Sequence, residues 1–315
     1  MAHSCVTQLS FQWQHVWHQT NQNSKNPWYN GFMVADILNG KKRAQEILDI
    51  LSDNSSHNRT MKLASIVVGN DKQSQYFSDL KLKKAHEIGL SGIKKSFPES
   101  FDPRKVVTYI HELNDDRNII GIVPQLPLPP QFDRASVLKT IHPFKDIDCL
   151  HPKNLGLLLE GSYTFISPVV LAIMEQIVLS KKYESKTIPY LNTSIELPDL
   201  TGIPICIVGT GLLVGKPLTA FLLNQGATIT VIDEHTPNPF EHTQKADIVV
   251  TGTNASDVLT ADAITDGTVV IDVGNDINAE LFLSKEIFLS TNPGGVGPLT
   301  VSYLLFNAIH SIIAS

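Results

Sequence analysis

The sequence has few cysteines, and they form no recognisable pattern. Cys5, Cys149 and Cys206 lie far apart, and none belongs to a C-x-x-C pair. This argues against a disulfide framework and against a thiolate zinc site. The eleven histidines also lack metal-ligand spacing, because the closest pair, His15 and His18, has no acidic or thiol partner beside it. We therefore expect no bound metal and a reducing, cytoplasmic location.

Two classes of partner leave no signature in the sequence. No apolar stretch approaches the roughly 20 residues that a membrane-spanning helix needs. The chain carries 25 basic and 31 acidic residues, a formal net charge of −6, and its basic residues are spread out rather than gathered into a stripe. We therefore expect neither a membrane nor a nucleic acid as a partner, and we favour a small-molecule ligand.

The length of 315 residues is sufficient for two domains with separate cores. Predicted strands and helices alternate along the chain, which is typical of parallel sheets covered by helices. The sequence therefore predicts an α/β fold of two domains, the second a Rossmann-like parallel sheet. Strands are expected at residues 63–68, 93–97, 119–123, 203–208, 228–232, 248–251 and 269–273, and helices after 39–41 and at 74–88, 103–113 and 299–314.

Changes in composition indicate the domain boundaries. Residues 1–31 contain all three tryptophans and a single lysine, and we interpret them as an extension of unknown role. Residues 181–202 are polar and contain prolines, as expected of a linker or a surface excursion. We assign residues 32–180 to a first domain, completed by a C-terminal helix at 299–315, and residues 181–298 to a dinucleotide-binding domain.

An apolar run that breaks into glycines is the feature that points to a nucleotide. Gly209, Gly211 and Gly215 directly follow a predicted strand, and Asp233 ends the next one. Glycines let backbone N–H groups approach a pyrophosphate at a helix N-terminus, and a carboxylate at the second place can bind a ribose diol. The spacing G-x-G-x-x-x-G differs from the usual fingerprint, so a glycine-rich structural turn is the alternative.

Several further segments occur in a fixed order. They are NGK at 39–41, VGNDKQSQ at 68–75, QLPLP at 125–129, KDID at 145–148, HPKN at 151–154, VGKP at 214–217, VIDVG at 270–274 and PGGVGP at 293–298. Together they resemble the bifunctional methylenetetrahydrofolate dehydrogenase/methenyltetrahydrofolate cyclohydrolase family, over about residues 34–313. The resemblance implies that the first domain binds folate and catalyses, and that the active site lies in a cleft between the domains.

The resemblance also gives roles to three polar residues. Lys81 holds the position of a lysine that lies over the one-carbon bridge of the folate and handles the proton and water chemistry of the cyclohydrolase step. Gln125 matches the glutamine that orients this lysine, and Asp148 matches the aspartate that holds the amino edge of the pterin. Without the resemblance, the three are an exposed helix lysine, a turn-capping amide and a solvated loop acid.

Other residues are expected to line the folate pocket. Gly294, Gly295 and Pro298 would form one wall, and a tight turn before a helix is the alternative. Phe77, with Tyr76 beside it, stands where the family carries a tyrosine, four residues before the lysine. Phenylalanine can stack on the folate but cannot donate a hydrogen bond, which puts cyclohydrolase efficiency in doubt more than folate binding.

The nucleotide loop departs from the family in a way that concerns the cofactor. The family usually reads G-R-S where this chain has G-T-G, so an arginine that helps to bind the 2′-phosphate of NADP is missing. Two carboxylates follow the next strand, and they repel a phosphate but accept hydrogen bonds from a free ribose diol. We therefore expect an NAD(P) cofactor with NAD favoured over NADP. The expected cofactor-binding residues are Gly209, Thr210, Gly211, Gly215, Asp233, Glu234 and Thr251.

The resemblance implies a homodimeric enzyme, paired through its nucleotide domain, with a folate as its small-molecule substrate. It would oxidise 5,10-methylenetetrahydrofolate to the methenyl cation with a nicotinamide and hydrolyse the cation to 10-formyltetrahydrofolate. One alternative is a monofunctional dehydrogenase, in which Phe77 reflects loss of the cyclohydrolase step. The other is a non-catalytic folate- or nucleotide-binding protein that retains the fold.

Overall fold

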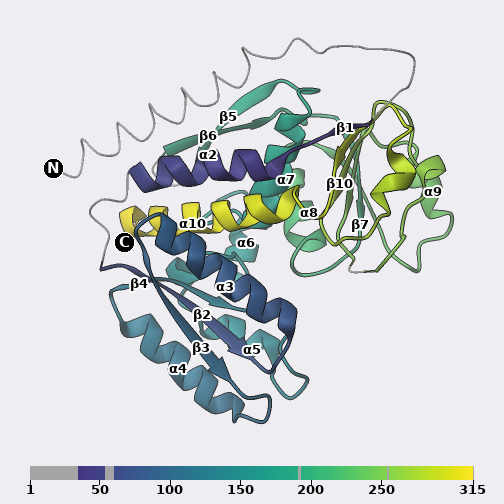
Figure 1. Cartoon of the computed structure of the whole chain (residues 1–315). Coiled ribbons are helices and arrows are strands. Elements are labelled where there is room, and N and C mark those ends of the chain that lie inside the picture. The colour runs from purple at the N-terminus through teal and green to yellow at the C-terminus, as the bar shows by residue number, and fades with distance from the viewer. Residues whose placement is uncertain (1–34, 54–59, 191–192, 254, 315) are drawn as a thin grey trace. The chain divides into compact units, whose positions relative to one another are not determined.

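The computed structural model describes residues 35–53, 60–190, 193–253 and 255–314 (Figure 1). The extension expected at residues 1–31 lies outside the described residues. The chain divides into two compact units, one containing the residues up to Gly40 and Ile173–Gly297, the other containing Lys41–Ala172 and Pro298–Ser315. These bounds differ from the sequence-based ones for residues 35–40 and 173–180, which the sequence places in the first domain, and for Pro298, which it places in the dinucleotide-binding domain.

One unit is built on a six-stranded parallel sheet with the strand order β1-β11-β10-β9-β7-β8. This confirms the Rossmann-like sheet that the alternating pattern predicts. Helices α8 and α9 pack on β7 and β8, and α7 ends in this unit. The bounds are β1 (Asp36–Ile37), β7 (Pro204–Val208), α8 (Gly215–Asn224), β8 (Thr228–Ile232), α9 (Pro239–Thr243), β9 (Ile248–Thr251), β10 (Val269–Asp272), β11 (Phe288–Ser290) and α7 (Pro168–Leu179).

The core of this unit follows from the register of its strands. Cys206 on β7 pairs with Val249 on β9, Val249 pairs with Val270 on β10, and Val270 pairs with Leu289 on β11. Paired residues of a parallel sheet point to the same face, so these four side chains form one buried row across it. Strands β9 and β10 are buried along their whole length, as is typical of a parallel sheet covered on both faces.

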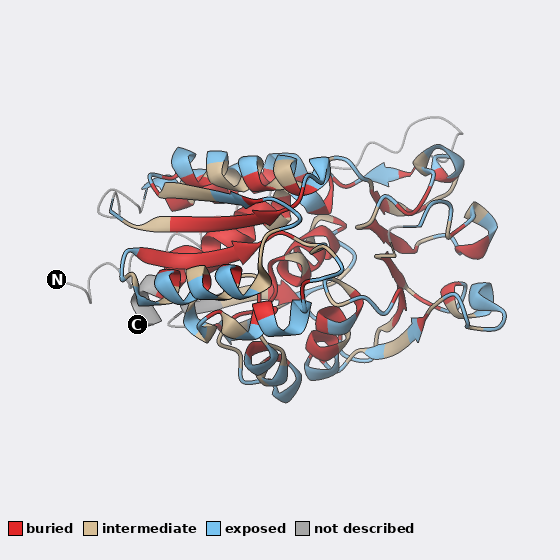
Figure 2. Cartoon of the chain, turned by 90° about the horizontal axis from the view of Figure 1, so that it is seen from below, coloured by how far each residue is buried: buried red, intermediate tan, exposed pale blue. Residues whose placement is uncertain are grey.

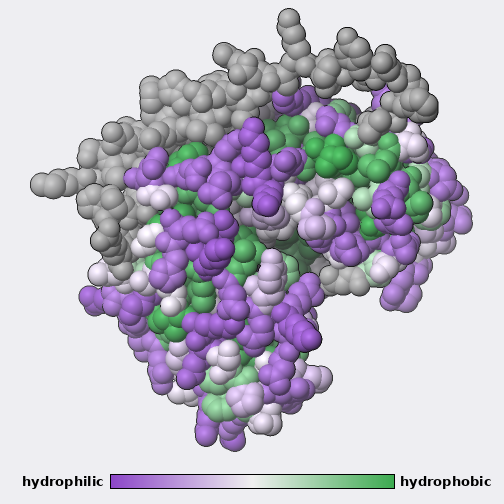
Figure 3. All heavy atoms as spheres, in the orientation of Figure 1, coloured by the Kyte–Doolittle hydropathy of each residue, from purple (hydrophilic) through white to green (hydrophobic). Residues whose placement is uncertain are grey.

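The other unit contains a three-stranded parallel sheet with the order β3-β2-β4. Its central strand β2 is an apolar run that is buried from its second residue to its last. Buried strands lie between helices whose outer faces are exposed (Figure 2), and hydrophilic residues are spread over the face seen in Figure 3. The bounds are α2 (Gly40–Asp53), β2 (Lys62–Val68), α3 (Lys72–Glu87), β3 (Ser91–Phe97), α4 (Pro103–Asp115), β4 (Ile119–Pro124), α5 (Arg134–Thr140), α6 (Pro152–Glu160) and α10 (Val296–Ala314).

The expected linker at residues 181–202 contains an element that the sequence analysis missed. Strands β5 (Ser185–Tyr190) and β6 (Thr193–Pro198) form an antiparallel hairpin. Exposed and partly buried residues alternate along β5, which is the pattern of a strand with one solvated face. The prolines obscure this pattern, although they are tolerated because both strands of a two-stranded hairpin are edge strands.

Candidate functional site

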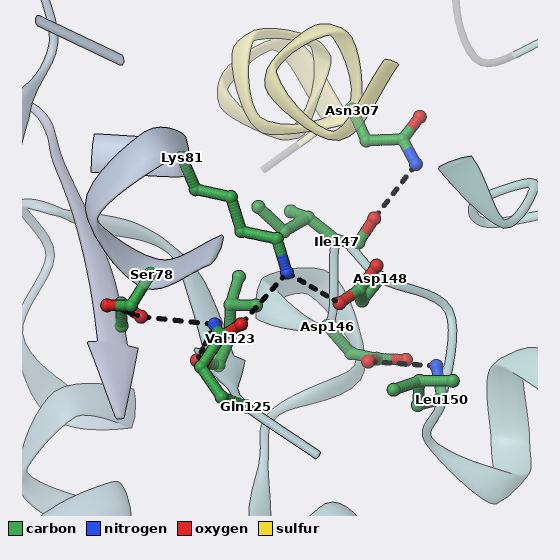
Figure 4. Close-up of polar contacts among 10 residues, drawn as sticks. Ser78, Lys81, Val123, Gln125, Asp146, Ile147, Asp148, Leu150 and Asn307 are labelled. Carbon is green, nitrogen blue, oxygen red and sulfur yellow. Dashed lines mark hydrogen bonds and ion pairs between the residues drawn. The ribbon is translucent and has the colours of Figure 1, made fainter. Parts of the chain in front are cut away.

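Three polar residues from separate parts of the chain converge in the unit with the three-stranded sheet (Figure 4). Lys81 lies on α3, Gln125 directly follows β4, and Asp148 lies in the turn before α6. The Nζ atom of Lys81 donates to Oε1 of Gln125 at 3.4 Å and lies 3.8 Å from Oδ2 of Asp148. The Lys81 side chain is only 13% exposed. The structure thus brings the three expected residues together. It excludes the alternative in which Lys81 is an exposed helix lysine.

Gln125 is buried and directly follows β4, at the carboxyl end of the strand, which is where open α/β sheets bind their ligands. Its Nε2 donates to Oγ of Ser65 on β2 at 3.1 Å and to the carbonyl oxygen of Val123 at 3.3 Å. The Oγ atoms of Ser65 and Ser78, on α3, are 2.8 Å apart. Both serines are fully buried, and the sequence analysis did not identify them.

The turn that carries Asp148 is anchored on its N-terminal side by Lys145. The Nζ atom of Lys145 donates to three carbonyl oxygens at the end of α4, those of Leu113, Asn114 and Asp116, at 2.7–2.9 Å. These carbonyls have no further turn of helix to bond, so a cation there satisfies them and complements the helix dipole. Lys145 therefore holds the turn in place rather than reaching the site.

Asn307 and Cys149 hold the remainder of this turn. The Nδ2 atom of Asn307, on α10, donates to the carbonyl oxygens of Ile147 and Ile166 at 2.9 Å each. The Sγ atom of Cys149 donates to the carbonyl oxygen of Phe165 at 3.2 Å. The residues on either side of Asp148 are thus fixed by buried contacts, and its own side chain, 21% exposed, faces Lys81 (Figure 4).

Asp146 ties the same turn to the start of α6. Its Oδ1 accepts from the backbone N–H of Leu150 at 3.0 Å, and its Oδ2 accepts from the backbone N–H of His151 and from Nδ2 of Asn154, each at 2.8 Å. Burial raises the pKa of the Asp146 carboxyl to about 7, although these three donors favour the anion. This aspartate lies within the KDID segment, and no role was expected for it from the sequence.

The raised pKa of Asp146 predicts a pH dependence of stability. The pKa of its carboxyl is about 7 in the folded state and 3.8 in the unfolded chain, so the folded state binds the proton more tightly. The stabilisation that comes from this proton is therefore complete below pH 4 and is lost as the pH rises through about 7. We expect the free energy of unfolding, relative to Asp146→Asn, to fall by on the order of 2 kcal/mol between pH 5 and 8. Urea unfolding of both proteins across this range measures the difference.

Asp133, the exposed N-cap of α5, offers a matched control. A hydrogen bond from Ser136 holds the pKa of its carboxyl below the usual value, so its contribution is already complete at pH 5. The difference between the natural protein and Asp133→Asn should therefore be flat from pH 5 to 8. A difference for Asp146→Asn that grows with pH would show that the three donors outweigh burial and would contradict the prediction.

The two aromatic residues before Lys81 have different surroundings. Phe77 is partly buried and lies four residues before Lys81 on α3, hence on the same face of the helix. Tyr76 is 62% exposed, and its ring lies edge-on to that of Phe77 at 5.6 Å between centroids. The tyrosine hydroxyl therefore does not take the place of the one that Phe77 lacks.

The three glycines of the nucleotide loop differ in conformation and in surroundings. Gly209 has a φ of +113°, and a Cβ on it would lie 2.8 Å from the carbonyl oxygen of Gly252. A Cβ on Gly215 would lie 2.1 Å from the carbonyl oxygen of Gly209, so α8 can begin against this loop only with a glycine there. Gly211 is exposed, and a Cβ on it would have no neighbour closer than 4.0 Å. The first two shape the turn, and the carbonyl oxygen of the third accepts from the N–H of Lys216 at 3.0 Å.

This loop holds the place at which dinucleotide-binding folds bind a pyrophosphate. It follows the carboxyl end of β7, and it leads into α8, whose N-cap residue, Val214, makes no side-chain hydrogen bond to the first turn. Thr210 is exposed at the same turn. The N–H of Lys216 donates to the carbonyl oxygen of Gly211 at 3.0 Å, and Pro217 has no N–H. In the first three residues of α8, the N–H of Gly215 is therefore the one left to face an anion.

The acidic residues after β8 are partly committed to their own turn. Oδ1 of Asp233 accepts from the backbone N–H of His235 at 3.0 Å and from Oγ1 of Thr236 at 3.3 Å. Glu234 is exposed, and its carboxylate lies 3.6 Å from Nε2 of His235. Thr251, at the end of β9, is fully buried, and its hydroxyl donates to Asp272 at 3.3 Å. The side chain of Thr251 therefore has an internal partner.

The glycines expected to line the folate pocket are required by the chain itself. Gly294 has a φ of +107°, a conformation that favours glycine. Gly295 is buried, and a Cβ on it would lie 2.2 Å from Oγ of Ser290 and 2.7 Å from the carbonyl oxygen of Thr291. Both observations fit a tight turn before α10, whose first turn contains Pro298. Their contact with a folate stays a prediction.

The described residues offer neither a membrane-spanning helix nor a metal-binding group of side chains. In the part of the chain that the structure describes, no helix is long and apolar enough to cross a membrane. Within the same residues, no group of three or more His, Cys, Asp or Glu side chains is arranged to hold a metal ion. Cys149 and Cys206 are free and buried, whereas Cys5, His15 and His18 lie outside the described residues.

Comparisons with protein families give a consistent result across the chain. The family model for the tetrahydrofolate dehydrogenase/cyclohydrolase catalytic domain matches residues 38–148, and the model for the NAD(P)-binding domain of the same proteins matches residues 190–315. The chain is 34% identical over 287 residues to the bifunctional protein FolD of Nautilia profundicola, covering 87% of this chain and 95% of the relative. It is 35% identical over 292 residues to FolD of Rickettsia rickettsii, covering 88% and 96%.

Solved structures show the same similarity. The bifunctional enzyme FolD from Campylobacter jejuni, a methylenetetrahydrofolate dehydrogenase/cyclohydrolase, matches with a TM-score of 0.79 and 28% identity, over 88% of this chain and 98% of that one. The dehydrogenase-cyclohydrolase from Trypanosoma brucei, complexed with NADP and an inhibitor, matches with a TM-score of 0.79 and 27% identity, over 89% and 98%.

Proposed function

Because this chain belongs to the tetrahydrofolate dehydrogenase/cyclohydrolase family, we propose that Lys81, Gln125 and Asp148 form its folate site and carry out the cyclohydrolase step. The chain is an enzyme of folate one-carbon metabolism with methylenetetrahydrofolate dehydrogenase and cyclohydrolase activities. The observation that carries the residue assignment is the convergence of a largely buried lysine, an oriented amide and a carboxylate.

Asp148 binds the substrate in this proposal. Its carboxylate accepts paired hydrogen bonds from the amino edge of the pterin, which a carboxylate can do because both oxygens are acceptors. Phe77 supplies an aromatic face for the folate ring. A bound nicotinamide supplies the hydride acceptor for oxidation of the methylene bridge. The contribution of this chain to that step is to hold the substrate in a reactive orientation.

Lys81 handles protons in the hydrolysis. Water adds to the one-carbon unit of the methenyl cation, and the bond from that carbon to N5 then breaks, leaving the formyl group on N10 and releasing one proton. Lys81 takes the proton of the attacking water and returns one to N5 as the ring opens. The Oε1 atom of Gln125, 3.4 Å from Nζ, keeps the lysine directed at the reacting carbon.

The cofactor is NAD(P), held by the loop from Gly209 to Gly215, and we propose that NAD is favoured over NADP. Support comes from the two carboxylates after β8, Asp233 and Glu234, which would repel a 2′-phosphate. Thr210 stands in the exposed turn where the family pattern has its arginine. A homodimer paired through the nucleotide-binding unit and a cytoplasmic location also stay predictions.

Hydrolysis in the absence of nucleotide tests the function directly. When methenyltetrahydrofolate is supplied alone, we expect its absorbance to fall in an enzyme-dependent way. The monofunctional alternative predicts no such loss. The non-catalytic alternative predicts, in addition, no NADH or NADPH from methylenetetrahydrofolate despite measurable folate binding.

Phe77→Tyr tests the cost of the missing hydroxyl. We expect the cyclohydrolase kcat to rise about fivefold, because one added hydrogen bond contributes on the order of 1 kcal/mol, and the dehydrogenase kcat to change less than twofold. Tyr76→Phe is the matched control, since it removes an exposed hydroxyl from the neighbouring position. A loss of cyclohydrolase activity in Tyr76→Phe, with none gained in Phe77→Tyr, would place the working hydroxyl on Tyr76 and contradict the proposal.

A further inference from the structure

We propose that Ser65 and Ser78 are positioning residues of the cyclohydrolase reaction, because they fix the orientation of the Gln125 amide against Lys81. Both serines are buried in the core beneath the site and neither contacts Lys81 in a hydrogen bond that the structure records. Their effect would pass through Gln125 alone. This inference rests on the proposed role of Lys81.

The two ends of the Gln125 amide have opposite requirements. Its Nε2 faces two acceptors, Oγ of Ser65 at 3.1 Å and the carbonyl oxygen of Val123 at 3.3 Å, while its Oε1 accepts from Nζ of Lys81 at 3.4 Å (Figure 4). Rotating the amide by 180° would set its N–H donors against the lysine donors and its carbonyl oxygen against that of Val123. The acceptors behind Gln125 therefore select the orientation that leaves an acceptor for Lys81.

Ser65 can act as that acceptor because it has its own partner. A buried hydroxyl costs free energy unless it is hydrogen-bonded, and Ser65 lies within the apolar run of β2. It accepts from Gln125 and lies 2.8 Å from Oγ of Ser78, to which it can donate. The serine pair therefore gives each buried hydroxyl a partner and leaves a lone pair of Ser65 for the amide.

The second serine links this network to the helix that carries the lysine. Ser78 and Lys81 are three residues apart on α3 and so lie on neighbouring positions of one face. The hydrogen bonds run from α3 through Ser78 and Ser65 to Gln125, and from Gln125 back to α3 at Lys81. This closed path fixes the amide relative to the lysine and not merely relative to the sheet.

Ser65→Ala tests the inference through the ratio of the two activities. We expect the cyclohydrolase kcat to fall about tenfold, because the amide loses one acceptor and the reversed orientation becomes populated. The dehydrogenase kcat should change less than twofold, since the hydride step does not use the lysine. In a Gln125→Ala background, adding Ser65→Ala should have no further effect, because no amide remains to be oriented.

A second substitution keeps the inference testable if Ser65→Ala folds poorly. Ser78→Ala leaves the direct acceptor of Gln125 in place, so we expect a smaller loss of cyclohydrolase kcat, about threefold. Ser302→Ala is the matched control, because Ser302 is a buried serine of α10 whose hydroxyl donates only to the Leu299 carbonyl among the hydrogen bonds recorded. Thermal unfolding of each variant reports whether the fold is retained.

Two results would overturn the inference. One is an equal loss of both activities in Ser65→Ala, and the other is an effect of Ser65→Ala that persists in the Gln125→Ala background; both indicate a structural role only. Failure of the proposed function looks different. In that case Lys81→Ala and Gln125→Ala would themselves leave cyclohydrolase activity unchanged. If these two substitutions lower the activity strongly and Ser65→Ala leaves it unchanged, only the role of the serine pair is refuted.

Discussion

Replacing Lys81 with alanine is expected to lower the cyclohydrolase kcat by at least about a hundredfold, the usual size of a general acid–base contribution. No other amine lies within the recorded contacts of Gln125 and Asp148 in the described residues, so a neighbouring lysine cannot substitute. The dehydrogenase kcat should fall far less, because hydride transfer requires position and not a proton carrier. Hydrolysis measured without nucleotide gives the cyclohydrolase kcat, and reduction of the nucleotide gives the dehydrogenase kcat.

Lys83→Ala provides the matched control for this substitution. Lys83 is two residues away on the same helix but exposed to solvent, and the removal of its charge should leave both activities within twofold of the natural protein. Unchanged hydrolysis in Lys81→Ala would refute the role of the lysine. An equal fall of both activities would instead indicate that Lys81 serves folate binding.

The residues of the site were predictable because Gln125 and Asp148 lie in short motifs that the resemblance covers, and Lys81 follows the motif at 68–75 by six residues. Lys81, Gln125 and Asp148 were expected together, and the structure places them within hydrogen-bond or ion-pair reach. The parallel sheet explains why this works from sequence. Motifs that follow strands gather at one edge of a parallel sheet, so residues far apart in the chain meet without any local signal of the meeting.

The residues beneath the site were not predictable in the same way. Ser65 interrupts an apolar strand and Ser78 sits on a helix, and nothing in either segment indicates that their hydroxyls are 2.8 Å apart. Their meeting depends on how α3 packs on β2, which is a tertiary fact. Asp146 is similar, because its three donors become visible only when the turn before α6 is folded.

The glycines show the opposite limitation. Gly215 was expected to bring the backbone close to a pyrophosphate and Gly295 to line the folate pocket, with a structural turn as the alternative for each, and a Cβ on either would collide with the protein's own backbone or side chains. Glycine is required in both cases, but by close packing of the chain. A glycine motif therefore predicts where backbone approaches something closely, and only the structure tells whether that neighbour belongs to the protein.

Reversal of the cofactor preference is the second large effect that we expect. The natural protein should show a higher kcat/KM with NAD than with NADP, and the double substitution Asp233→Ser with Glu234→Arg should raise kcat/KM with NADP by about tenfold to a hundredfold. That range corresponds to removing two repulsive charges and adding an attractive one near a partly solvated phosphate. Serine at position 233 retains an oxygen that can accept from the N–H of His235, as Oδ1 of Asp233 does at 3.0 Å.

The geometry of this turn decides how cleanly the experiment can be interpreted. The Glu234 side chain is 86% exposed, so an arginine there adds charge without disturbing packing. Glu241→Arg on α9 is the matched control for Glu234→Arg, because it makes the same change of charge as that single substitution at another exposed position of the same unit and should leave the NAD to NADP ratio unchanged. If Glu241→Arg shifted the ratio as strongly, the effect would come from the overall field of the unit and not from the turn. A preference of the natural protein for NADP would refute the assignment, and Asp233 would then be explained by its hydrogen bonds to His235 and Thr236 alone.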